Sequence, residues 1–372
     1  MAKYKIAVLP GDGIGKDVMD AAMIVLDKLD LDAEYKYGDV GWEFWKKEGN
    51  PLPDRTIELL KNADACLFGA ITSKPKDDAQ KELAKELQGK GYTYYSPIVR
   101  LRQLFDLYIN LRPAKAYEGN PLVIKGGIDL VMFRENTEGM YAGVEFYPLP
   151  DDVKEAFLRH SKNMQAFKDV PNDEIAVSTR ITTKKGMTRI IRAAFEYAKK
   201  HNRRKVTLVE KPNVLRETGG LTVKIAREIA KEYPEIEYEE ANVDAMAMWL
   251  VKKPTEYDVL VAENLFGDII SDLASQLVGG LGFAASGNIG DNFGLFEPTH
   301  GSAPKYAGQY KVNPIAMILA VKLMLQYLSE HDMAERVEKA VSEVIKEGKV
   351  RTYDMGGNAS TLDVARAIAE RL

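Results

Sequence analysis

The segment VLPGDGIGKDV, residues 8–18, decides which kind of α/β fold the chain can adopt. An apolar run enters a turn with glycines at positions 11, 13 and 15, and a helical pattern follows, so we expect a strand, a turn and a helix. The Rossmann fingerprint Gly-x-Gly-x-x-Gly needs its third glycine where Lys16 stands here. The segment therefore predicts a turn that uses glycine for its backbone conformation, and it does not predict a Rossmann nucleotide site.

Length and composition favour a two-domain protein that acts on a small molecule. The chain has 372 residues, of which 45% are apolar. Its 51 basic and 55 acidic residues are spread along the chain and leave a net charge of −4, which disfavours nucleic acid and anionic membranes as partners. No signal-peptide pattern and no apolar run of about 18 residues is present, so we expect a cytoplasmic protein. The single cysteine, Cys66, lies in an apolar segment and is expected to be buried.

Strand and helix patterns alternate along the chain, which is typical of an α/β fold. Residues 17–29 place apolar side chains on one face of a helix. GGIDLVMFREN (126–136) and RKVTLVEKPNV (204–214) are predicted strands that end in polar residues, where α/β proteins collect their sites. Residues 141–181 contain proline breaks and a period-two pattern, which predicts an excursion from the main body.

Arginines gather in SPIVRLRQLFDLYINLRP (96–113) and in FRENTEGMY (133–141). For any one of them a surface role is the simpler interpretation, because arginine stems cover apolar surface. Arg134 differs, since it follows a run apolar enough for a central strand and so emerges at a strand end. A planar guanidinium suits carboxylates bidentately, so this position favours an acidic ligand.

ENLFGDIISDLASQL, residues 263–277, carries Asp268 and Asp272 four positions apart. A helix would place both carboxylates on one face, where like charges repel. A divalent cation would remove that repulsion, and carboxylate oxygens are ligands that Mg²⁺ and Mn²⁺ prefer. The alternative is a solvated acidic helix face. Asp244 is a lone carboxylate that gains interest only beside these two.

Residues 287–314 are rich in glycine, asparagine and proline, so we expect mostly loop. A long ordered loop inside a compact domain is usually functional, although a lone loop histidine such as His300 is usually polar surface. Lys305 and Lys311, with Tyr306 between them, would suit an anionic ligand.

Seven ordered motifs resemble those of the β-decarboxylating dehydrogenases, the family of isocitrate, homoisocitrate and 3-isopropylmalate dehydrogenases. They are GDGIG, DLYINLRP, RENTEGMYAG, KPNVL, NLFGDIISDLASQLVGGLG, NIGD and EPTHGSAPKYAG, and together they span nearly the whole chain. The resemblance implies an isopropylmalate dehydrogenase-like two-domain α/β fold, not a Rossmann fold, with a central mixed sheet flanked by helices. It further implies a large cofactor-binding domain (1–107 plus 279–372), a small substrate and dimerisation domain (108–140 plus 182–278) and a clasp-like excursion (141–181).

The same resemblance implies a role for individual residues. Substrate carboxylates would be bound by Arg102, Arg112 and Arg134, with Ser96 adding a hydroxyl. Mg²⁺ or Mn²⁺ would be held by Asp244, Asp268 and Asp272, and the catalytic residues would be Tyr141, Lys211 and Asp244. The cofactor residues would be Thr72, Asn213, Glu297, His300, Gly301, Lys305, Tyr306, Asn313, Tyr353 and Asp354. A homodimer with shared sites is expected, in which Lys211 and Asp244 reach in from the other chain.

The cofactor expected from the resemblance is NADP. PKYAG resembles the NADP-dependent isocitrate dehydrogenases, in which lysine and tyrosines meet the 2′-phosphate, and Tyr353 agrees. NAD-using relatives typically carry Asp and an aliphatic residue at the positions of Lys305 and Tyr306. Gly357 stands where bacterial NADP enzymes usually have arginine, so NAD stays an alternative.

The substrate expected from the resemblance is isocitrate, oxidised to 2-oxoglutarate as in the tricarboxylic acid cycle. Ser96 and Val99 match isocitrate enzymes, whereas Ile98 keeps homoisocitrate and 3-isopropylmalate open. A regulatory subunit without turnover is the remaining alternative, and it is disfavoured because every catalytic position carries the expected residue type.

Overall fold

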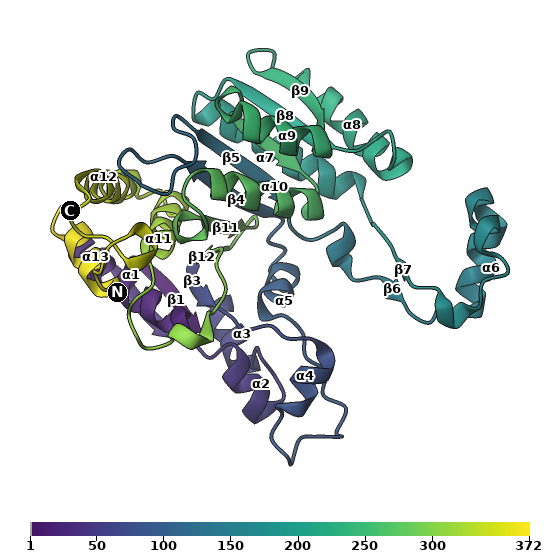
Figure 1. Cartoon of the computed structure of the whole chain (residues 1–372), viewed down its shortest axis with the longest axis horizontal. Helices are drawn as coiled ribbons and strands as arrows, with labels where there is room; N and C mark the ends of the chain where they lie inside the picture. Colours follow the sequence, from purple (N-terminus) through teal and green to yellow (C-terminus); the bar gives the residue numbers. More distant parts are fainter. Residues whose placement is uncertain (1) are drawn as a thin grey trace.

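A ten-stranded mixed sheet, in the order β2-β1-β3-β12-β11-β4-β5-β10-β8-β9, forms the centre of the computed structural model, which describes residues 2–372 (Figure 1). β11 and β4 pair with each other antiparallel, as do β11 with β12 and β4 with β5, while the remaining neighbours are parallel. The strands are β1 (Tyr4–Gly11), β2 (Ala33–Tyr37), β3 (Ala65–Ala70), β4 (Ile109–Lys115), β5 (Asp129–Glu135), β8 (Lys205–Glu210), β9 (Glu237–Asn242), β10 (Val259–Ala262), β11 (Ala285–Ile289) and β12 (Gly294–Pro298). The expected α/β class with a mixed central sheet is confirmed.

The sheet order separates two halves of the chain at the seam between β11 and β4. The first five strands of the sheet order (β2, β1, β3, β12 and β11) come from residues 1–107 and 279–372. The other five (β4, β5, β10, β8 and β9) come from residues 108–278. The large apolar cluster of the first half is built with α1 (Ile14–Leu29), α11 (Ile315–Tyr327), α12 (His331–Glu347) and α13 (Thr361–Ala369). α2 (Trp42–Glu48), α3 (Asp54–Lys61), α4 (Lys76–Lys81) and α5 (Pro97–Leu104) also belong to this half. In the second half, α7 (Lys184–Lys200) and α8 (Arg216–Ala230) cover one face, and α9 (Val243–Lys252) and α10 (Asn264–Leu277) cover the other. The apolar clusters thus lie mostly within one half or the other, and the division into two domains stays a prediction.

The glycine turn after β1 is a structural feature, as predicted. Gly11 and Gly13 have φ angles of 73° and 55°, which favour glycine. A Cβ at Gly13 would lie 2.1 Å from the carbonyl oxygen of Ser302, and that oxygen accepts a hydrogen bond from the N–H of Ile14 over 2.9 Å. The turn therefore packs directly against the loop that follows β12.

The expectation of mostly loop over 287–314 is wrong for its first half. Residues 287–289 and 294–298 belong to β11 and β12, two strands at the centre of the sheet. Gly287 and Gly294 leave room for the ring of Phe296, and the buried amide of Asn288 is hydrogen-bonded within the sheet. Tertiary packing thus outweighs the low strand propensity of glycine and asparagine.

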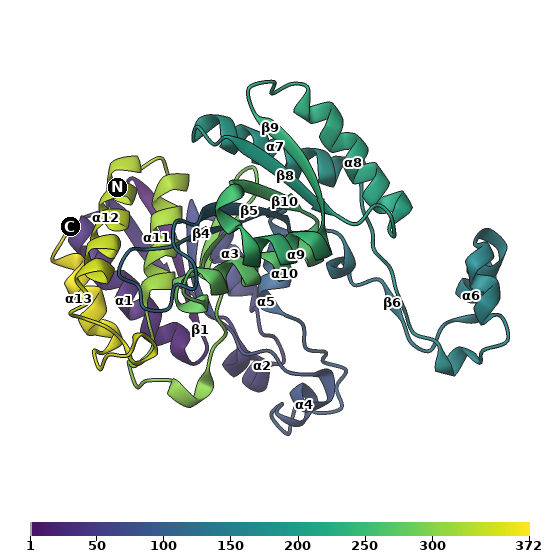
Figure 2. The same ribbon diagram turned by 45° about the horizontal axis from the view of Figure 1, so that its top comes forward.

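The predicted excursion is an arm that stands away from the body in both ribbon views (Figures 1 and 2). β6 (Glu145–Phe146) pairs antiparallel with β7 (Val177–Ser178), and α6 (Asp151–His160) lies near the tip. The paired strands are much shorter than the period-two pattern suggested. At its base the arm is closed by backbone pairing of Gly139 with Ile181.

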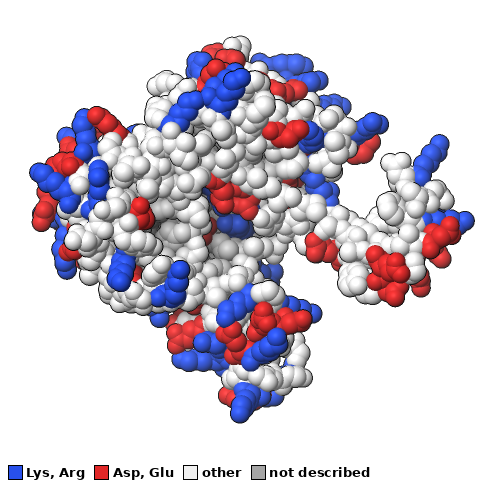
Figure 3. All heavy atoms as spheres, in the orientation of Figure 1, with Lys and Arg blue, Asp and Glu red and all other residues white. Residues whose placement is uncertain are grey.

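Acidic and basic side chains intermingle over the face seen in the space-filling view (Figure 3). Among residues 2–372, we find no helix with the length and apolar character that crossing a membrane requires. Cys66 is fully buried, as predicted, and burial raises the pKa of its thiol.

Candidate active site

Predicted arginines and aspartates meet at the seam between the two halves of the sheet. Arg112 lies on β4 and Arg134 near the end of β5, and both are buried, whereas Asp268 and Asp272 lie one turn apart on α10. Nη1 of Arg112 donates to Oδ1 of each aspartate over 3.1 Å. Nη1 of Arg134 donates to the same oxygen of Asp268. The prediction that both carboxylates share one helix face is confirmed.

Gly267 allows α10 to lie close to the end of β5. A Cβ at this position would come within 2.7 Å of the Cβ of Arg134. Nε of Arg134 donates to Oδ1 of Asn264 over 2.9 Å, which fixes the guanidinium against the first turn of the helix. Leu130 to Glu135 are all buried, so Arg134 emerges from a central strand as the sequence predicted.

The guanidinium groups offset the repulsion between the two carboxylates. Burial by itself raises the pKa of Asp268, but Arg134 and Arg112 hold that pKa below its usual value. Burial and the nearby charge of Asp268 raise the pKa of Asp272, although Arg112 opposes this. The four-residue spacing of the two aspartates predicted a divalent cation at this helix face. Within one chain, the arginines supply part of the positive charge that the two carboxylates need.

Tyr141 belongs to the same cluster. Its hydroxyl donates to Oδ2 of Asp268, and the guanidinium carbon of Arg134 lies 5.0 Å from the centre of its ring. Burial and the bond to Asp268 raise the pKa of the phenol. Tyr141 is therefore protonated at neutral pH, as a proton donor has to be.

Arg102 is held by Asn288, which the sequence analysis did not select, and by Glu297, which it assigned to the cofactor. Its Nε donates to Oδ1 of Asn288 over 2.9 Å, and its Nη2 donates to Oε1 of Glu297 over 3.2 Å. The same oxygen of Asn288 accepts from Asn110 (2.8 Å) and Asn136 (3.0 Å), across the seam between β11, β4 and β5. The available signal was the presence of asparagine inside apolar strand patterns. Glu297, predicted to bind cofactor, is placed beside a predicted substrate arginine.

Two buried guanidinium nitrogens in this cluster have no hydrogen-bond partner among residues 2–372. They are Nε of Arg112 and Nη2 of Arg134. A charged donor left unpaired in the interior costs free energy, so an acidic ligand that accepts from these nitrogens would bind favourably. Ser96, at the N-terminus of the helix that carries Arg102, is half-buried and makes no side-chain cap.

Lys211 and Asp244 lie apart from this cluster within one chain. Nζ of Lys211 donates to Oδ1 of Asp244 over 2.6 Å, and this contact lowers the pKa of the carboxyl. The Asp244 side chain is 67% exposed. In the part of the chain that the structure describes, no hydrogen bond or ion pair joins either residue to Asp268 or Asp272. Asn213, two positions after Lys211, is exposed beside them and not in the loop after β12.

Within one chain, only two of the three predicted metal ligands lie together. Asp268 and Asp272 offer the carboxylate oxygens that Mg²⁺ and Mn²⁺ prefer. Over residues 2–372, however, no group of three or more His, Cys, Asp or Glu side chains could hold a metal ion. The third carboxylate, Asp244, is not brought to them within the chain.

Most of the predicted cofactor residues gather around the loop after β12. Oγ1 of Thr72 lies 2.7 Å from Oγ of Ser302, so the end of β3 touches this loop. Nδ1 of His300 contacts the carbonyl of Gly301 at 3.0 Å, while its Nε2 is buried without a partner among the described residues. Gly301 has open space where a Cβ would be. An unpaired ring nitrogen beside an open glycine fits a bound polar ligand.

An aromatic and basic pocket lies at the far end of that loop. Tyr306 and Tyr353 have ring centroids 5.9 Å apart, and Nζ of Lys305 lies 4.7 Å from the Tyr306 centroid. Lys311 lines the pocket beside both rings. Asn313 donates to Asp354 over 3.2 Å and its Oδ1 accepts from Ile315, so these two predicted residues also help to build the start of α11.

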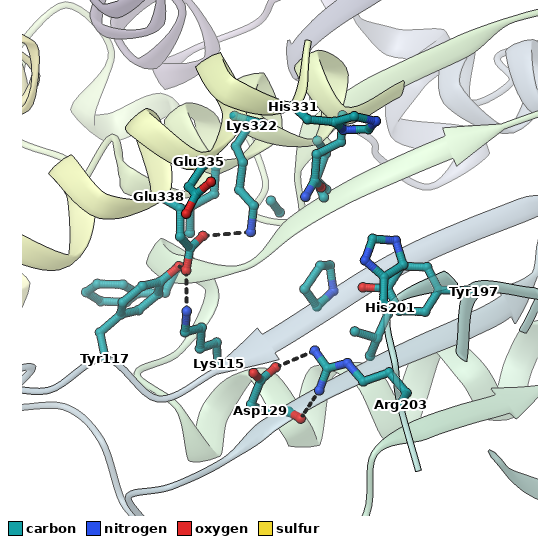
Figure 4. Close-up of a pocket in the computed structure, with 18 residues that line it drawn as sticks. Lys115, Tyr117, Asp129, Tyr197, His201, Arg203, Lys322, His331, Glu335 and Glu338 are labelled. Atoms are coloured by element: carbon teal, nitrogen blue, oxygen red, sulfur yellow. Dashed lines mark hydrogen bonds and ion pairs between the residues drawn. The ribbon is translucent and has the colours of Figure 1, made fainter. Parts of the chain in front are cut away.

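A separate cavity of about 360 Å³ contains none of the predicted site residues (Figure 4). Its lining includes Pro113 and Val131, which alternate along β4 and β5 with Arg112 and Arg134, so it lies on the opposite face of the sheet. Glu338 of α12 accepts hydrogen bonds there from Lys115 and Lys322, each over 2.6 Å. These ion pairs join the two halves behind the candidate site.

The mixed α/β sheet and the buried arginines and carboxylates at its seam are suited to an enzyme that acts on an acidic small molecule. The family model described as isocitrate/isopropylmalate dehydrogenase matches residues 5–368. The chain belongs to this family, whose members are oxidatively decarboxylating dehydrogenases that use NAD(P) and a divalent metal.

Individual relatives carry different substrate names. The chain is 44% identical to Protein DlpA of Legionella pneumophila, with 98% of this chain aligned but only 58% of that protein. It is 44% identical to a 3-isopropylmalate dehydrogenase of Archaeoglobus fulgidus, covering 99% of each chain. Relatives at 42% and 40% identity are named homoisocitrate and isocitrate/homoisocitrate dehydrogenase. The crystal structure of an isocitrate dehydrogenase from Methylococcus capsulatus matches with a TM-score of 0.85 and 41% identity over 99% of each chain.

Proposed function

We propose that the chain oxidatively decarboxylates isocitrate to 2-oxoglutarate with NADP and Mg²⁺ or Mn²⁺. The observation that carries this proposal is the buried cluster at the seam, in which unpaired guanidinium nitrogens lie beside two carboxylates and a protonated phenol. A hydroxy acid with several carboxylates would satisfy those donors.

In this proposal Arg102, Arg112 and Arg134 bind the substrate carboxylates. The bound divalent cation would polarise the 2-hydroxyl and stabilise negative charge on its oxygen, and the nicotinamide would accept the hydride from C2. Lys211 would take the proton of the hydroxyl. Tyr141 would give its proton to C3 once the carboxylate has left as CO₂.

A second copy of the chain would complete the site. Asp244 and Lys211 are then the partner's contribution, with Asp244 as third metal ligand. Apolar side chains are exposed on the adjoining helices α9 and α10, where Met248, Val251 and Ile269 are 53%, 58% and 56% exposed. Such apolar exposure favours an interface. Tyr147 and Phe167 on the arm are 72% and 52% exposed, which supports its proposed role as a clasp between subunits.

NADP is proposed because a basic, aromatic pocket suits a phosphate. Lys305 and Lys311 supply cations beside Tyr306 and Tyr353. Gly357 lines the same pocket without adding a charge, so NAD is the competing cofactor.

Isocitrate is proposed because Ser96 offers a free hydroxyl at the start of the helix that carries Arg102. Ile98 packs partly against the apolar cluster that contains Leu101, so it is only partly available to a ligand. The names of the relatives make 3-isopropylmalate and homoisocitrate the competing substrates.

A substrate panel tests the proposal. Initial rates are measured with isocitrate, homoisocitrate, 3-isopropylmalate, tartrate and malate, each with NAD⁺ and NADP⁺, with Mn²⁺ or EDTA. We expect the highest kcat/KM for isocitrate with NADP⁺ and no turnover in EDTA. A higher value for another acid replaces the proposed substrate, and no turnover with any of them favours a regulatory subunit.

A further inference from the structure

A buried ion cluster outside the predicted site joins the base of the arm to the end of β8, which precedes Lys211, and to the start of α10, which carries the predicted metal ligand Asp268. Arg180 follows β7, Glu210 ends β8, and Glu263 precedes the first turn of α10. Their side chains are 8%, 2% and 2% exposed. One cation thus lies between two buried carboxylates, and none of the three belongs to the predicted substrate, cofactor, metal or catalytic residues.

Arg180 holds Glu210 with a two-pronged contact. Nη1 donates to Oε1 over 3.1 Å and Nη2 to Oε2 over 2.6 Å. Oε1 of Glu210 also accepts the backbone N–H of Lys211 over 2.8 Å. The guanidinium of Arg180 therefore fixes the carboxylate of Glu210. That carboxylate in turn holds the backbone of Lys211.

The same guanidinium faces the start of α10. Oε1 of Glu263 caps the helix by accepting from the N–H of Phe266 over 2.9 Å. Its Oε2 lies 3.7 Å from Nε of Arg180, and the guanidinium carbon lies 5.1 Å from the centre of the Phe266 ring. The helix that begins here carries Asp268. Arg180 thus also restrains the turn from which that carboxylate projects.

The segment that leads into the arm meets this cluster as well. Gly139 pairs with Ile181, the residue after Arg180, and a Cβ at Gly139 would lie 2.6 Å from Oε2 of Glu263. Tyr141 follows two positions later. The segments that carry Tyr141, Lys211 and Asp268 therefore all border one buried arginine.

We propose that Arg180 is a positioning residue for the decarboxylation reaction. Its guanidinium holds the end of β8 and the start of α10 at fixed places relative to the base of the arm. This inference rests on the proposed function, because it assigns Lys211 and Asp268 their roles. Without the guanidinium, two buried carboxylates would repel each other and draw in water. A lysine keeps the charge but has no planar fork, so it cannot hold Glu210 bidentately while facing Glu263.

The test compares Arg180→Lys and Arg180→Met with the wild-type dehydrogenase. Arg192→Lys is the matched control, since Arg192 makes a two-pronged contact of 2.7 and 2.9 Å with Glu232 at the surface. For each protein we would measure the thermal unfolding temperature, kcat, and the KM for isocitrate and for NADP⁺. Electron paramagnetic resonance would give the affinity for Mn²⁺.

We expect folded Arg180→Lys to lose about tenfold in kcat and about tenfold in Mn²⁺ affinity, with the KM for the nucleotide unchanged. Arg192→Lys should match the wild type, and Arg180→Met should lose more than Arg180→Lys if it folds. A lowered unfolding temperature with wild-type kcat and Mn²⁺ affinity in Arg180→Lys would overturn the inference. If the proposed function is wrong, the wild type itself will lack turnover with isocitrate. The Mn²⁺ affinities of the wild type and the variants can still be compared in that case, so the two failures are distinguishable.

Discussion

Two groups of predicted site residues are held in opposite ways in the same chain. The arginine–aspartate cluster is buried at the seam, and Asp268 contacts Arg112, Arg134 and Tyr141. The Lys211–Asp244 pair is joined by a single contact of 2.6 Å, and its aspartate is 67% exposed.

The contrast separates what one chain can prepare from what needs a second surface. Charged groups fixed in a buried cluster are oriented before a ligand arrives, which is the requirement for electrostatic stabilisation of a reaction. An exposed ion pair adds little stability and is held loosely by itself. We therefore expect the buried cluster to be complete in one chain and the exposed pair to act on the site of another.

Asp268→Asn should break the buried cluster and give the largest loss. The amide cannot neutralise Arg134 and Arg112, and it weakens the acceptor of the Tyr141 hydroxyl. We expect kcat to fall by about a thousandfold and the Mn²⁺ requirement to rise, measured by initial rates over a Mn²⁺ titration. Asp272→Asn is the control and should lose less, because Asp272 contacts only Arg112 of these groups. Wild-type turnover in Asp268→Asn would remove this carboxylate from the mechanism.

Lys211→Met and Arg112→Ala, each inactive alone, should complement each other when co-expressed. In a mixed dimer one site keeps both an intact Arg112 and an intact Lys211, and the other site carries both defects. Random pairing makes about half of the dimers mixed, so about a quarter of wild-type activity should return. Activity of isolated mixed dimers, purified with two different tags, is the measurement. Inactive mixed dimers would place Lys211 in the site of its own chain.

Replacing Lys305 with Asp and Tyr306 with Ile should change cofactor choice without touching either group of catalytic residues. The exchange removes a cation beside the Tyr306 ring and adds an acceptor for ribose hydroxyls. Because a charge-assisted contact contributes on the order of 1.5 to 3 kcal/mol, we expect the NADP/NAD ratio of kcat/KM to fall by about tenfold or more. An unchanged ratio in the double variant would show that the 2′-phosphate lies elsewhere.

Glu338→Gln should have the smallest effect on turnover, because Glu338 belongs to an ion network on the other face of the sheet (Figure 4). Lys322 and Lys115 outweigh the effect of burial and lower the pKa of Glu338 to about 2. This depressed pKa stabilises the folded chain above the ordinary pKa of 4.5, and the contribution is lost as pH falls from there towards 2.

We expect Glu338→Gln to lower the free energy of unfolding at pH 7 by about 1 to 3 kcal/mol and to leave kcat unchanged. Urea titrations of both proteins should converge as pH falls towards 2. A stability difference that is the same at pH 3 and pH 7 would contradict the role assigned to the carboxylate charge.

Sequence patterns were sufficient for the fold class and for much of the buried cluster. The structure contains the predicted helix after the glycine turn, the buried Cys66 and the arm. It also places Arg134 at a strand end, and Asp268 and Asp272 on one helix face. Each depends on local periodicity or on a short spacing along one element. β11 and β12 were missed because glycine and asparagine are poor strand formers and only their neighbours explain them.

What the sequence by itself determined is the set of elements and the residue types of the site, since both follow from periodicity and motif order within single segments. Tertiary structure decided which charges neutralise one another. Only the placement of α5 beside β11 brings Arg102 to Asn288, and only the folding of the base of the arm against the end of β8 and the start of α10 brings Arg180 between Glu210 and Glu263. The physical reason is that ion pairs and hydrogen bonds form over about 3 Å in space, whereas their partners are separated by distances along the chain that no local pattern encodes.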